Sequence, residues 1–428
     1  MLDINIIRQN PEKIKKSTQE KGVDQQLVDQ LLEVDKKRRE LINQIEKLKQ
    51  ERNQLLQNVT TKPEQDVIKK GKQLKKKLAE LEPKLGKIEN EFKKLLFQIP
   101  NPAARDVKPG KSETENEILR KWGKPPKFDF KVRDHLEIGE LLDIIDVKRA
   151  GKASGSRFGY FKGDAARLEF ALVQFALKTL TKEGFIPIIP PVLIKKKAMQ
   201  GMGYLEHGGE EDMYVLDKDK LVLVGTSEQS IGPMHMNEVL DVKKLPLRYM
   251  GFSSCFRREA GSYGKDTRGI LRVHQFDKVE MFSFTKPEDS DKEHEFFLGL
   301  EEKIYQALKI PYQVVKMCTG DLGMPAARKY DLEAWMPGQE QSLSKEKRGR
   351  YREITSTSNT TDFQARRLNI KYQEGQKTAY VHMLNGTALA IGRVIIAILE
   401  NYQQKDGSVK VPQVLQSYIG KEMIRKSG

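Results

Sequence analysis

Two long heptad repeats near the N-terminus constrain the fold of this chain more than any other feature. Mostly apolar residues recur in alternating steps of four and three, without a slip, over residues 27–59 and again over residues 67–99. This spacing indicates helices that wind around a partner along one narrow seam. Residues 60–66, between the two repeats, carry turn chemistry and no periodicity. The seam positions are Leu27, Leu31, Val34, Arg38, Leu41, Ile45, Leu48, Arg52, Leu55 and Val59, then Val67, Gly71, Leu74, Leu78, Leu81, Leu85, Ile88, Phe92, Leu95 and Ile99.

Two such helices joined by a short loop are predicted to form an antiparallel coiled-coil hairpin, called the arm below (residues 27–99). Each helix of about 33 residues, at ~1.5 Å per residue, would reach ~50 Å. Arg38, Arg52 and Gly71 occupy seam positions, and Pro83 is predicted to interrupt and kink the second helix. The periodicity alone favours a spacer or an oligomerisation device over a nucleic-acid-binding arm.

Basic residues outnumber acidic residues, and the imbalance is concentrated near the N-terminus. The 428 residues include 76 Lys and Arg against 60 Asp and Glu, a net charge of +16, and residues 1–100 alone carry 23 against 16. Such a surplus favours polyanionic partners, most commonly nucleic acid, although solubility alone is an alternative explanation. A basic two-helix arm would suit the backbone of a nucleic acid.

Composition also excludes several classes of protein. No stretch approaches 18 consecutive apolar residues, so no membrane span is expected, and the N-terminus lacks the charged and apolar regions of a signal peptide. The two cysteines, Cys255 and Cys318, lack the spacing of a disulfide framework or of a cysteine zinc site. A reducing cytoplasm is therefore the expected compartment.

The chain changes character after the arm. Helical patterns such as Ala165–Glu183 alternate with strand-like runs, which predicts an α+β domain with a mainly antiparallel sheet. The predicted strands are Ile186–Ile194, Leu221–Val224, Leu247–Phe252, Lys278–Phe284 and Tyr312–Met317. A linker is predicted from the chain breakers Pro100, Pro102, Pro109, Gly110, Gly123, Pro125 and Pro126.

Familiar catalytic and nucleotide-binding motifs do not fit. Residues Gly261–Asp266 are too short for a phosphate-binding loop, and no Ser or Thr follows Lys265. The six histidines never occur at the spacing of a zinc hydrolase. The Gly-x-Ser-x-Gly pattern of a serine hydrolase does not occur either.

A glycine-punctuated basic segment is the strongest candidate for chemistry. Residues Cys255–Gly269 combine arginines, lysine and glycines and run into a strand-like stretch near Arg272. From Gln275 onward the residues alternate as in a strand, so Phe276 and Glu280 share one face. Arginines for phosphoryl charge, a mobile loop and an aromatic ring for a base suit a nucleoside triphosphate. From composition alone, a solvated basic hairpin without a ligand is as good an explanation as a triphosphate site.

The order of these segments resembles that of the seryl-tRNA synthetases, a family of class II aminoacyl-tRNA synthetases. Residues 256–269, Phe-Arg-Arg-Glu-Ala-Gly-Ser-Tyr-Gly-Lys-Asp-Thr-Arg-Gly, followed by residues 272–280, Arg-Val-His-Gln-Phe-Asp-Lys-Val-Glu, closely resemble motif 2 of that family. Residues 184–191 look like motif 1, the dimer-interface helix and strand, and residues 385–393 look like motif 3.

Two further segments and the arm extend the resemblance over nearly the whole chain. Thr226-Ser227-Glu228 matches the short Thr-x-Glu loop of the family, and residues 351–356 match its segment before motif 3. The N-terminal hairpin resembles the arm that this family uses on tRNA. Motif 2 and the arm together make the resemblance highly specific.

The resemblance implies a role for each matched position. Arg257 would contact the α-phosphate and the serine carboxylate, Arg393 would hold the γ-phosphate, and Phe276 would stack on adenine. Arg257 and Arg393 are the implied catalytic residues, and no side-chain nucleophile is needed because positioning and electrostatics carry the adenylation. The implied ATP-binding residues are Arg257, Arg258, Glu259, Phe276, Glu353, Ile354, Thr355, Ser356 and Arg393. The implied serine-binding residues are Thr226, Ser227, Glu228, Arg257, Glu280 and Thr387.

The resemblance also implies a metal ion and a polar amino-acid pocket. Glu353 and Ser356 would supply the hard oxygen ligands that Mg²⁺ prefers. Glu280 would bind the serine ammonium or hydroxyl group with Thr387 nearby. A site built to hydrogen-bond a hydroxyl leaves buried groups unpaired when alanine enters, so such a pocket suits serine.

Together, these features predict a cytoplasmic, homodimeric, Mg²⁺-dependent serine–tRNA ligase of the α+β class. An N-terminal tRNA-binding domain with the arm covers residues 1–105, a linker covers 106–130, and a class II catalytic domain on a mainly antiparallel sheet covers 131–428. The implied partners are L-serine, ATP, tRNA(Ser) and a second copy of the chain, with no membrane. Whether the tRNA for selenocysteine, tRNA(Sec), is also charged is left open.

Two other functions remain as alternatives to a serine–tRNA ligase. A synthetase-like ligase that serylates a carrier protein would typically lack the tRNA arm that residues 27–99 supply. A non-catalytic nucleic-acid-binding coiled-coil protein with an inactive synthetase fold would be expected to lose Arg257, Glu353 or Arg393, and all three are present.

One segment departs from the family pattern. Residues 341–350, Gln-Ser-Leu-Ser-Lys-Glu-Lys-Arg-Gly-Arg, are inserted where the family passes almost directly into the Tyr-Arg-Glu segment. This basic insertion is predicted to be disordered when free, and ten extra residues in a surface loop cost little stability. A tolerated insertion is favoured over a contact to tRNA or to ATP phosphate.

Overall fold

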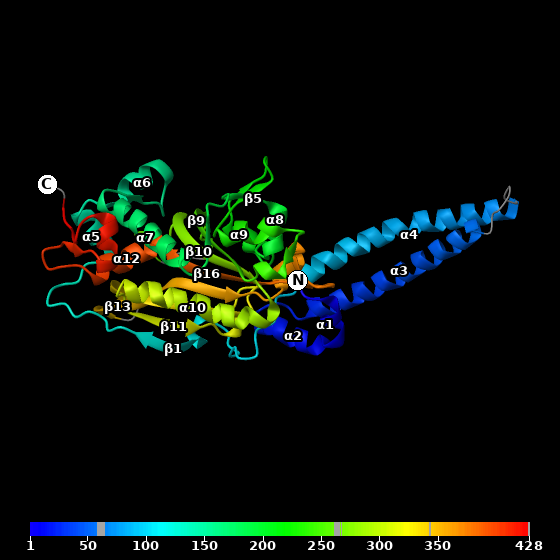
Figure 1. Cartoon of the computed structure of the whole chain (residues 1–428), viewed down its shortest axis with the longest axis horizontal. Helices are drawn as coiled ribbons and strands as arrows, with labels where there is room; N and C mark the ends of the chain where they lie inside the picture. The colour runs from blue at the N-terminus through cyan, green and yellow to red at the C-terminus, as the bar shows by residue number, and fades with distance from the viewer. Residues whose placement is uncertain (58–64, 261–265, 267, 342–343, 427–428) are drawn as a thin grey trace. The chain divides into compact units, whose positions relative to one another are not determined.

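The chain divides into two compact units, Met1–Pro102 and Ala103–Gly428. The computed structural model describes residues 1–57, 65–260, 266, 268–341 and 344–426, with the backbone alone at 340–341 and 344–348 (Figure 1). Seam residue Val59 and residues 261–265 and 267 of the glycine-rich segment lie outside the described residues. No helix among the described residues is long and apolar enough to cross a membrane.

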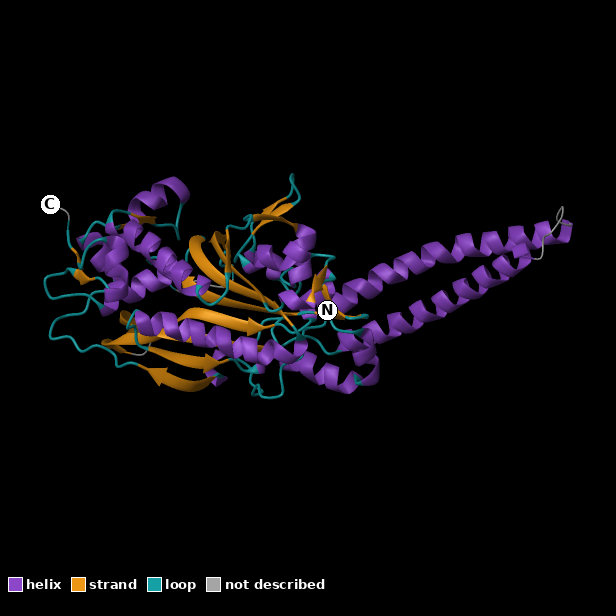
Figure 2. Cartoon of the chain, in the orientation of Figure 1, coloured by secondary structure: helices purple, strands orange, loops and turns teal. Residues whose placement is uncertain are grey.

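The described residues of the first unit form helices only (Figure 2). The two long helices lie side by side as a hairpin, and the two short helices pack at its base (Figure 1). The side chain of Asp24 accepts a hydrogen bond from the backbone N–H of Gln26 at 2.9 Å and so caps the first long helix. The helices are α1 (Ile4–Gln9), α2 (Pro11–Glu20), α3 (Gln26–Gln57) and α4 (Gln65–Gln98).

The predicted seam is confirmed as the line along which α3 and α4 pack. Every described seam residue except Arg52 is buried or half-buried. The two remaining irregular positions also face the partner helix: the guanidinium of Arg38 lies 4.6 Å from the centre of the Phe92 ring, and Gly71 lies opposite Leu55. Stacking on an aromatic face lets the arginine occupy a seam position at little cost.

The predicted interruption at Pro83 is wrong, because α4 runs through this residue without a break. A proline removes one backbone hydrogen bond from a helix, but here its side chain is exposed and the seam residues Leu81 and Leu85 on either side are half-buried against α3. At the base of the arm, the carboxylate of Asp35 accepts hydrogen bonds from Arg8 at 2.7 and 2.8 Å, which ties α1 to α3.

An eight-stranded sheet forms the centre of the second unit. All neighbouring strands pair antiparallel except β4, which pairs parallel to β9, and this confirms the predicted mainly antiparallel sheet. The strands in spatial order are β1 (Glu117–Trp122), β11 (Tyr312–Lys316), β12 (Arg328–Gln341), β13 (Ser344–Asn359), β16 (His382–Ala390), β10 (Gln275–Thr285), β9 (Leu247–Phe256) and β4 (Ile186–Ile188).

Three long helices pack on this sheet and bury its apolar residues. Helix α10 (Ser290–Ala307) contacts β10, β13 and β16, helix α12 (Ile391–Asn401) contacts β12, and helix α7 (Asp164–Thr181) contacts β9 (Figure 1). A side chain at Gly386 would meet Phe297 of α10, so α10 covers one face of β16. The neighbouring residues Asn385 and Thr387 therefore point to the opposite face.

Shorter elements complete the second unit around the sheet. The short helices are α5 (His135–Leu141), α6 (Val147–Ser154), α8 (Lys196–Met202), α9 (Glu228–Ile231), α11 (Phe363–Leu368) and α13 (Gln413–Ile419). The small sheets are β2 (Ile145–Asp146) with β3 (Tyr160–Phe161), β5 (Leu193–Lys195) with β7 (Leu221–Leu223) and β6 (Val215–Leu216), β15 (Lys377–Tyr380) with β14 (Lys371–Glu374) and β8 (Val239–Asp241), and β17 (Val409–Lys410) with β18 (Met423–Ile424).

Two segments differ from the sequence-based expectation. The predicted linker, residues 106–130, contains β1, which pairs with β11 as an edge strand; the prolines and glycines that suggested a linker flank this short strand. Within the insertion predicted to be disordered, residues 344–350 belong to β13 and Arg350 pairs with Met336, whereas Ser342 and Leu343 lie outside the described residues. Pairing between the two strands gives their backbone N–H and C=O groups hydrogen-bond partners, whereas in a free loop these groups would bind water.

Candidate active site

A cavity of about 430 Å³ opens on the face of the sheet that α10 does not cover. It is lined by β10, β13 and β16, by the start of α12, and by the loop between β7 and α9. Most of the residues singled out from the sequence meet there, although they are spread over almost 170 positions of the chain. Those that line the cavity are Thr226, Glu228, Arg257, Glu259, Phe276, Glu280, Glu353, Ile354, Thr355, Ser356, Thr387 and Arg393.

Two of the predicted site residues do not line the cavity. Ser227 is fully buried, and its hydroxyl donates to the carbonyl oxygen of Gly251 at 3.5 Å. The guanidinium of Arg258 lies 5.8 Å from the centre of the Tyr214 ring. Ser227 and Arg258 each lie between two residues whose side chains line the cavity. Side chains of successive residues point in different directions, so these two point away from it.

Arg257 and Arg393 both line the cavity. Arg257 donates from Nε to the carbonyl oxygen of Gly225 at 3.1 Å, and its guanidinium lies 5.3 Å from the centre of the Phe276 ring. Arg393 pairs with Glu353, with 3.1 Å between Nη1 and Oε2. These contacts hold two guanidinium groups in place without using all of their donors, so both can still bind an anion.

Glu353 remains ionised at neutral pH although it lies in the cavity wall. Loss of surrounding water is the largest single effect and raises the pKa of this carboxyl, but the positive charges of Arg393, Lys329 and Arg257 and the hydrogen bond from Arg393 together outweigh it and lower the pKa to about 2. The ionised carboxylate of Glu353 and the hydroxyl of Ser356, which both line the cavity, offer hard oxygen atoms. Such a set suits Mg²⁺, which takes one or two protein ligands and completes its shell with phosphates and water.

Two buried carboxylates line the cavity: Glu228, and Glu280, which lies four residues further along β10 than Phe276. Glu280 is 1% exposed, and its Oε2 lies 2.6 Å from Nζ of Lys278 and accepts a hydrogen bond from the hydroxyl of Thr387 at 3.1 Å. Glu228 is 4% exposed, and its Oε1 accepts a hydrogen bond from the hydroxyl of Tyr204. Each carboxylate therefore has one oxygen atom fixed by the protein.

Burial raises the pKa of Glu228 to about 7, and the negative charge of Glu280 adds to this shift. A cation that entered the cavity beside Glu228 would favour the ionised form of this carboxyl. The two carboxylates and the nearby hydroxyl groups therefore form a polar site for a small ligand that carries an ammonium group and a hydroxyl group.

Lys278 and Tyr204 belong to this site and were not predicted from the sequence. Lys278 lies between Phe276 and Glu280 on the same face of β10, so the alternation that identified its neighbours could also have identified it. Tyr204 follows α8 in an irregular segment outside every recognised motif, and no signal in the sequence pointed to its contact with Glu228.

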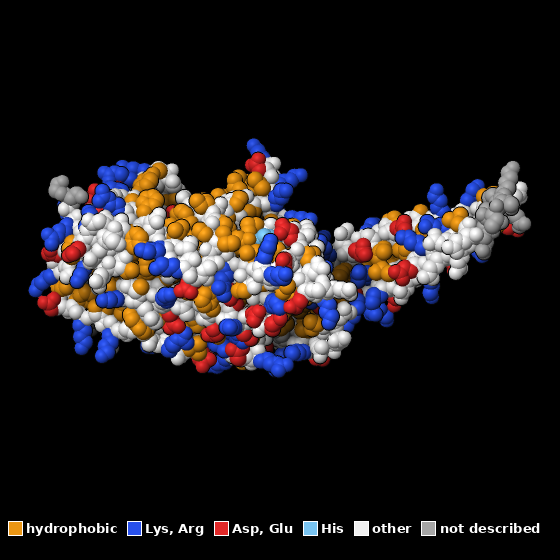
Figure 3. All heavy atoms as spheres, viewed as in Figure 1, with side chains coloured by type: hydrophobic (Ala, Val, Ile, Leu, Met, Phe, Trp, Pro, Cys, Tyr) orange, Lys and Arg blue, Asp and Glu red, His pale blue; other side chains and the backbone are white. Residues whose placement is uncertain are grey.

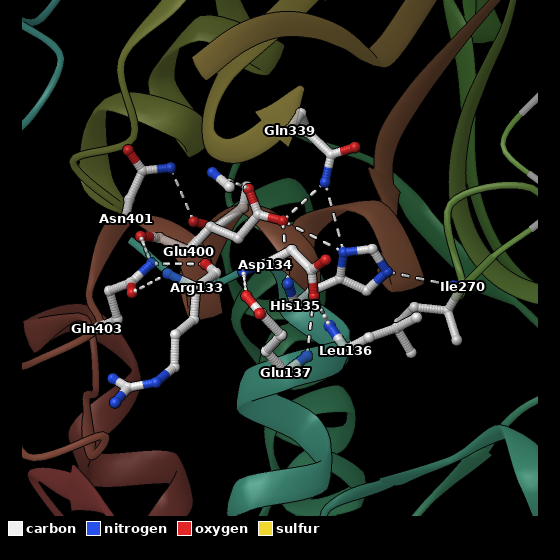
Figure 4. A network of polar contacts seen from close by, with 12 residues as sticks. Arg133, Asp134, His135, Leu136, Glu137, Ile270, Gln339, Glu400, Asn401 and Gln403 are labelled. Atoms are coloured by element: carbon white, nitrogen blue, oxygen red, sulfur yellow. Dashed lines mark hydrogen bonds and ion pairs between the residues drawn. The ribbon is translucent and has the colours of Figure 1, made fainter. Parts of the chain in front are cut away.

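A buried polar network fixes elements beside the cavity (Figure 4). The carboxylate of Glu400 on α12 accepts hydrogen bonds from the side chain of Gln339 at 2.7 Å and from the backbone N–H of Gly338 at 2.8 Å, and it pairs with His135 Nδ1 at 3.2 Å. The backbone N–H of Ile270, a residue of the cavity wall, donates to Nε2 of the same histidine at 3.4 Å. The network thus anchors the end of the glycine-rich segment to α12.

Two family models match this chain. A model described as the seryl-tRNA synthetase N-terminal domain matches residues 1–103. A model described as the tRNA synthetase class II core domain (G, H, P, S and T) matches residues 214–402, a range that includes all of the predicted site residues.

Full-length relatives and solved structures agree with these models. A serine–tRNA ligase of Dictyoglomus turgidum is 45% identical over 431 residues, which cover 99% of each chain. The seryl-tRNA synthetase of Pyrococcus horikoshii, solved in complex with ATP, has a TM-score of 0.92 at 39% identity and is covered in full, as is this chain. The cytoplasmic serine–tRNA ligase of Naegleria fowleri, solved in complex with AMP, has a TM-score of 0.88 at 35% identity. The match covers all of this chain and 99% of the Naegleria chain.

The carrier-protein alternative has no support, because the relatives matched over the full length are serine–tRNA ligases and the arm is present. The alternative of an inactive synthetase fold is not favoured either, since Arg257, Glu353 and Arg393 all line the cavity. The chain therefore belongs to the seryl-tRNA synthetases, the class II enzymes that ligate serine to tRNA.

Proposed function

We propose that the single cavity described above binds serine and ATP end to end and joins them as seryl-adenylate before the serine passes to tRNA. The observation that carries this proposal is the separation of charge along the cavity. Arg257 lies beside Phe276, and the carboxylate of Glu280 lines the cavity four residues further along β10. A triphosphate suits the arginine and the ring, and an amino acid suits the carboxylate.

At the phosphate end, the residues of this chain position charge rather than supply a nucleophile. Arg257 would bind the α-phosphate and the serine carboxylate together, so that the carboxylate oxygen attacks phosphorus while pyrophosphate leaves. Arg393 would hold the γ-phosphate, and Phe276 would stack on adenine. Donors fixed before the reaction stabilise the negative charge that develops during it, and alignment of the two reactants lowers the entropic barrier.

Mg²⁺ is proposed as the metal ion that accompanies ATP. Glu353 and Ser356 would hold it, and it would supply a positive charge that neutralises phosphate oxygens. No group of three His, Cys, Asp or Glu residues that could hold a metal is present among the described residues.

At the amino-acid end, the ammonium group of serine would bind Glu228 and Thr226, and its hydroxyl would bind Glu280 beside Thr387. Glu280 and Thr387 face each other across β10 and β16. Their hydrogen bond fixes the position at which a substrate hydroxyl can be recognised.

Replacing Glu280 by alanine is expected to raise the KM for serine by at least about tenfold, since a hydrogen bond to a charged group contributes about 1.5–3 kcal/mol. The KM for ATP should change much less, because ATP is assigned to the other end of the cavity. ATP–pyrophosphate exchange measures both constants. Glu374→Ala removes an exposed carboxylate that pairs with Lys286 and serves as the matched control. Unchanged serine constants in Glu280→Ala would place this carboxylate outside the serine site.

The raised pKa of Glu228 predicts a pH dependence of serine activation. Below about pH 7 the free enzyme holds this carboxyl mostly protonated, and a protonated carboxyl cannot pair with the ammonium group of serine. The kcat/KM for serine is therefore expected to fall as the pH drops below about 7. The fall should approach about tenfold for each pH unit. Glu228→Gln, which cannot ionise, should lose this limb of the profile. An identical acid limb in Glu228→Gln would assign it to another group.

The arm is proposed to hold tRNA(Ser). Lys and Arg side chains stand along the outer surface of α3 and α4 (Figure 3), where they can approach the phosphates of a nucleic acid. The wider prediction that tRNA(Sec) is also charged is tested by aminoacylation of each tRNA separately.

We also propose a homodimer formed through the predicted motif 1 region. Apolar side chains are exposed on and near the edge strand β4: Phe170 is 69%, Ile186 is 47% and Ile189 is 86% exposed. A second copy would cover this surface, as expected for a self-complementary interface. The cytoplasm is the proposed compartment, where the buried, free Cys255 and Cys318 would stay reduced.

A further inference from the structure

Lys278 is a buried cation at the amino-acid end of the cavity to which the proposed function assigns no role. It is 6% exposed on β10, between Phe276 and Glu280, and all three side chains line the cavity. Its Nζ lies 2.6 Å from Oε2 of Glu280 and 3.4 Å from the hydroxyl oxygen of Thr387. The hydroxyl of Thr387 donates to the same Oε2 at 3.1 Å. Lysine, threonine and carboxylate thus form a closed triangle.

The two carboxylates of this site differ in what holds them. Glu280 is held by a cation, Lys278, whereas Glu228 is held by a neutral hydroxyl group, that of Tyr204. Glu280 and Lys278 together carry no net charge. Lys278 and Arg257 also act on the charge of Glu228, but the group that contacts its carboxylate is a hydroxyl and not a cation. Glu228 is therefore the carboxylate that can pair with the ammonium group of a ligand.

We infer that Lys278 determines which side chains the amino-acid site accepts: it neutralises Glu280, so that the site takes one ammonium group, at Glu228, and rejects a second cation where serine carries its hydroxyl. This inference rests on the proposed binding of serine at this end of the cavity. The hydroxyl of serine can donate to Glu280 in the presence of Lys278. An ammonium group in that place would lie next to the charge on Nζ, and like charges repel strongly in a site with little water.

L-2,3-Diaminopropionate tests the inference directly, because it is serine with an ammonium group in place of the hydroxyl. The measurement is ATP–pyrophosphate exchange by the full-length enzyme with each amino acid, expressed as the ratio of the kcat/KM for serine to that for diaminopropionate. The wild type should prefer serine strongly. Lys278→Met, which keeps the length of the side chain and removes its charge, should narrow this ratio by about 10²-fold. Lys278→Arg, which keeps the charge, should retain the wild-type preference.

Tyr204→Phe separates charge from a general loosening of the site. This variant removes the hydroxyl that holds Glu228 and leaves every charge in place. It should raise the KM for serine without narrowing the ratio between the two amino acids. A ratio narrowed equally in Tyr204→Phe, or a ratio unchanged in Lys278→Met, would overturn the inference.

A measurement on the wild type alone covers the case in which Lys278→Met does not fold. Diaminopropionate and alanine are compared as inhibitors of serine-dependent exchange, since alanine is slightly smaller and has a neutral side chain. Weaker inhibition by diaminopropionate supports the inference, and stronger inhibition overturns it. Failure of serine itself to drive exchange would contradict the proposed function instead, so the two failures are distinguishable.

Discussion

Arg257→Lys is expected to slow serine-dependent ATP–pyrophosphate exchange by about 10²-fold or more, the scale of loss when one fixed charge-stabilising donor is removed. The structure holds the guanidinium of Arg257 by one hydrogen bond to Gly225 and against the ring of Phe276. Lysine presents a point charge without the planar fork, so it cannot bridge a phosphate and a carboxylate in the same way. Arg257→Ala should lose at least as much.

Arg366→Lys is the matched control for this experiment. Arg366 pairs with Asp362 at 2.6 Å on α11 and does not line the cavity. The same substitution there should leave the exchange rate within a few-fold of the wild type, which separates loss of a guanidinium in the cavity from a general cost of the change. Near-normal exchange by Arg257→Lys would mean that a point charge suffices and that the assigned bridging role is wrong.

Shortening the arm is expected to abolish tRNA charging and to spare serine activation. Residues 41–89 are replaced by a short linker, which keeps the ion pair of Arg8 with Asp35 and the contact of Arg38 with Phe92 at the base. The cavity lies wholly within the second unit, so exchange should remain near the wild-type rate. Aminoacylation of tRNA(Ser) is measured in parallel. Normal charging by the shortened enzyme would make the arm a spacer.

A variant that keeps the arm tests its charge. Lys75, Lys76 and Lys77 form an exposed basic run on α4, and their replacement by glutamine should weaken tRNA binding and flatten its dependence on salt. A full-length arm that lost these charges without losing affinity would place the tRNA contacts elsewhere.

The arm was predictable because one simple repeat controls it. A heptad places every fourth and third residue on one seam, and the seam needs only the facing helix to be buried, as Leu31 and Leu74 show. Pro83 is the residue of the arm for which the prediction was wrong. The seam contacts on either side of it hold α4 together although proline disfavours the interior of a helix.

The central strands were harder to predict. Strands β12 and β13 were missed because charged residues such as Lys329, Asp331 and Glu353 interrupt their apolar runs, and a bulge between Leu332 and Glu333 breaks the alternation. Sheet pairing with β11 and β16 stabilises these strands, and such long-range pairing leaves no local sequence signal.

The candidate site residues were predicted from sequence motifs. The omission of Tyr204 and the inclusion of Ser227 and Arg258 both follow from this reliance on motifs. Residues in recognised motifs, such as Arg257 and Thr387, meet in the cavity. Tyr204 was missed because it reaches Glu228 from an irregular segment. Ser227 and Arg258 were included because they neighbour motif residues, although the backbone directs their side chains away from the cavity.

The most direct test of the account is ATP–pyrophosphate exchange by the full-length enzyme with each of the twenty amino acids in turn, without tRNA. The cavity wall, in which Glu280 is joined to Thr387 and Arg257 lies beside Phe276, predicts that serine drives exchange well above every other amino acid. Exchange driven as well by a different amino acid, or no exchange with serine, would contradict the account.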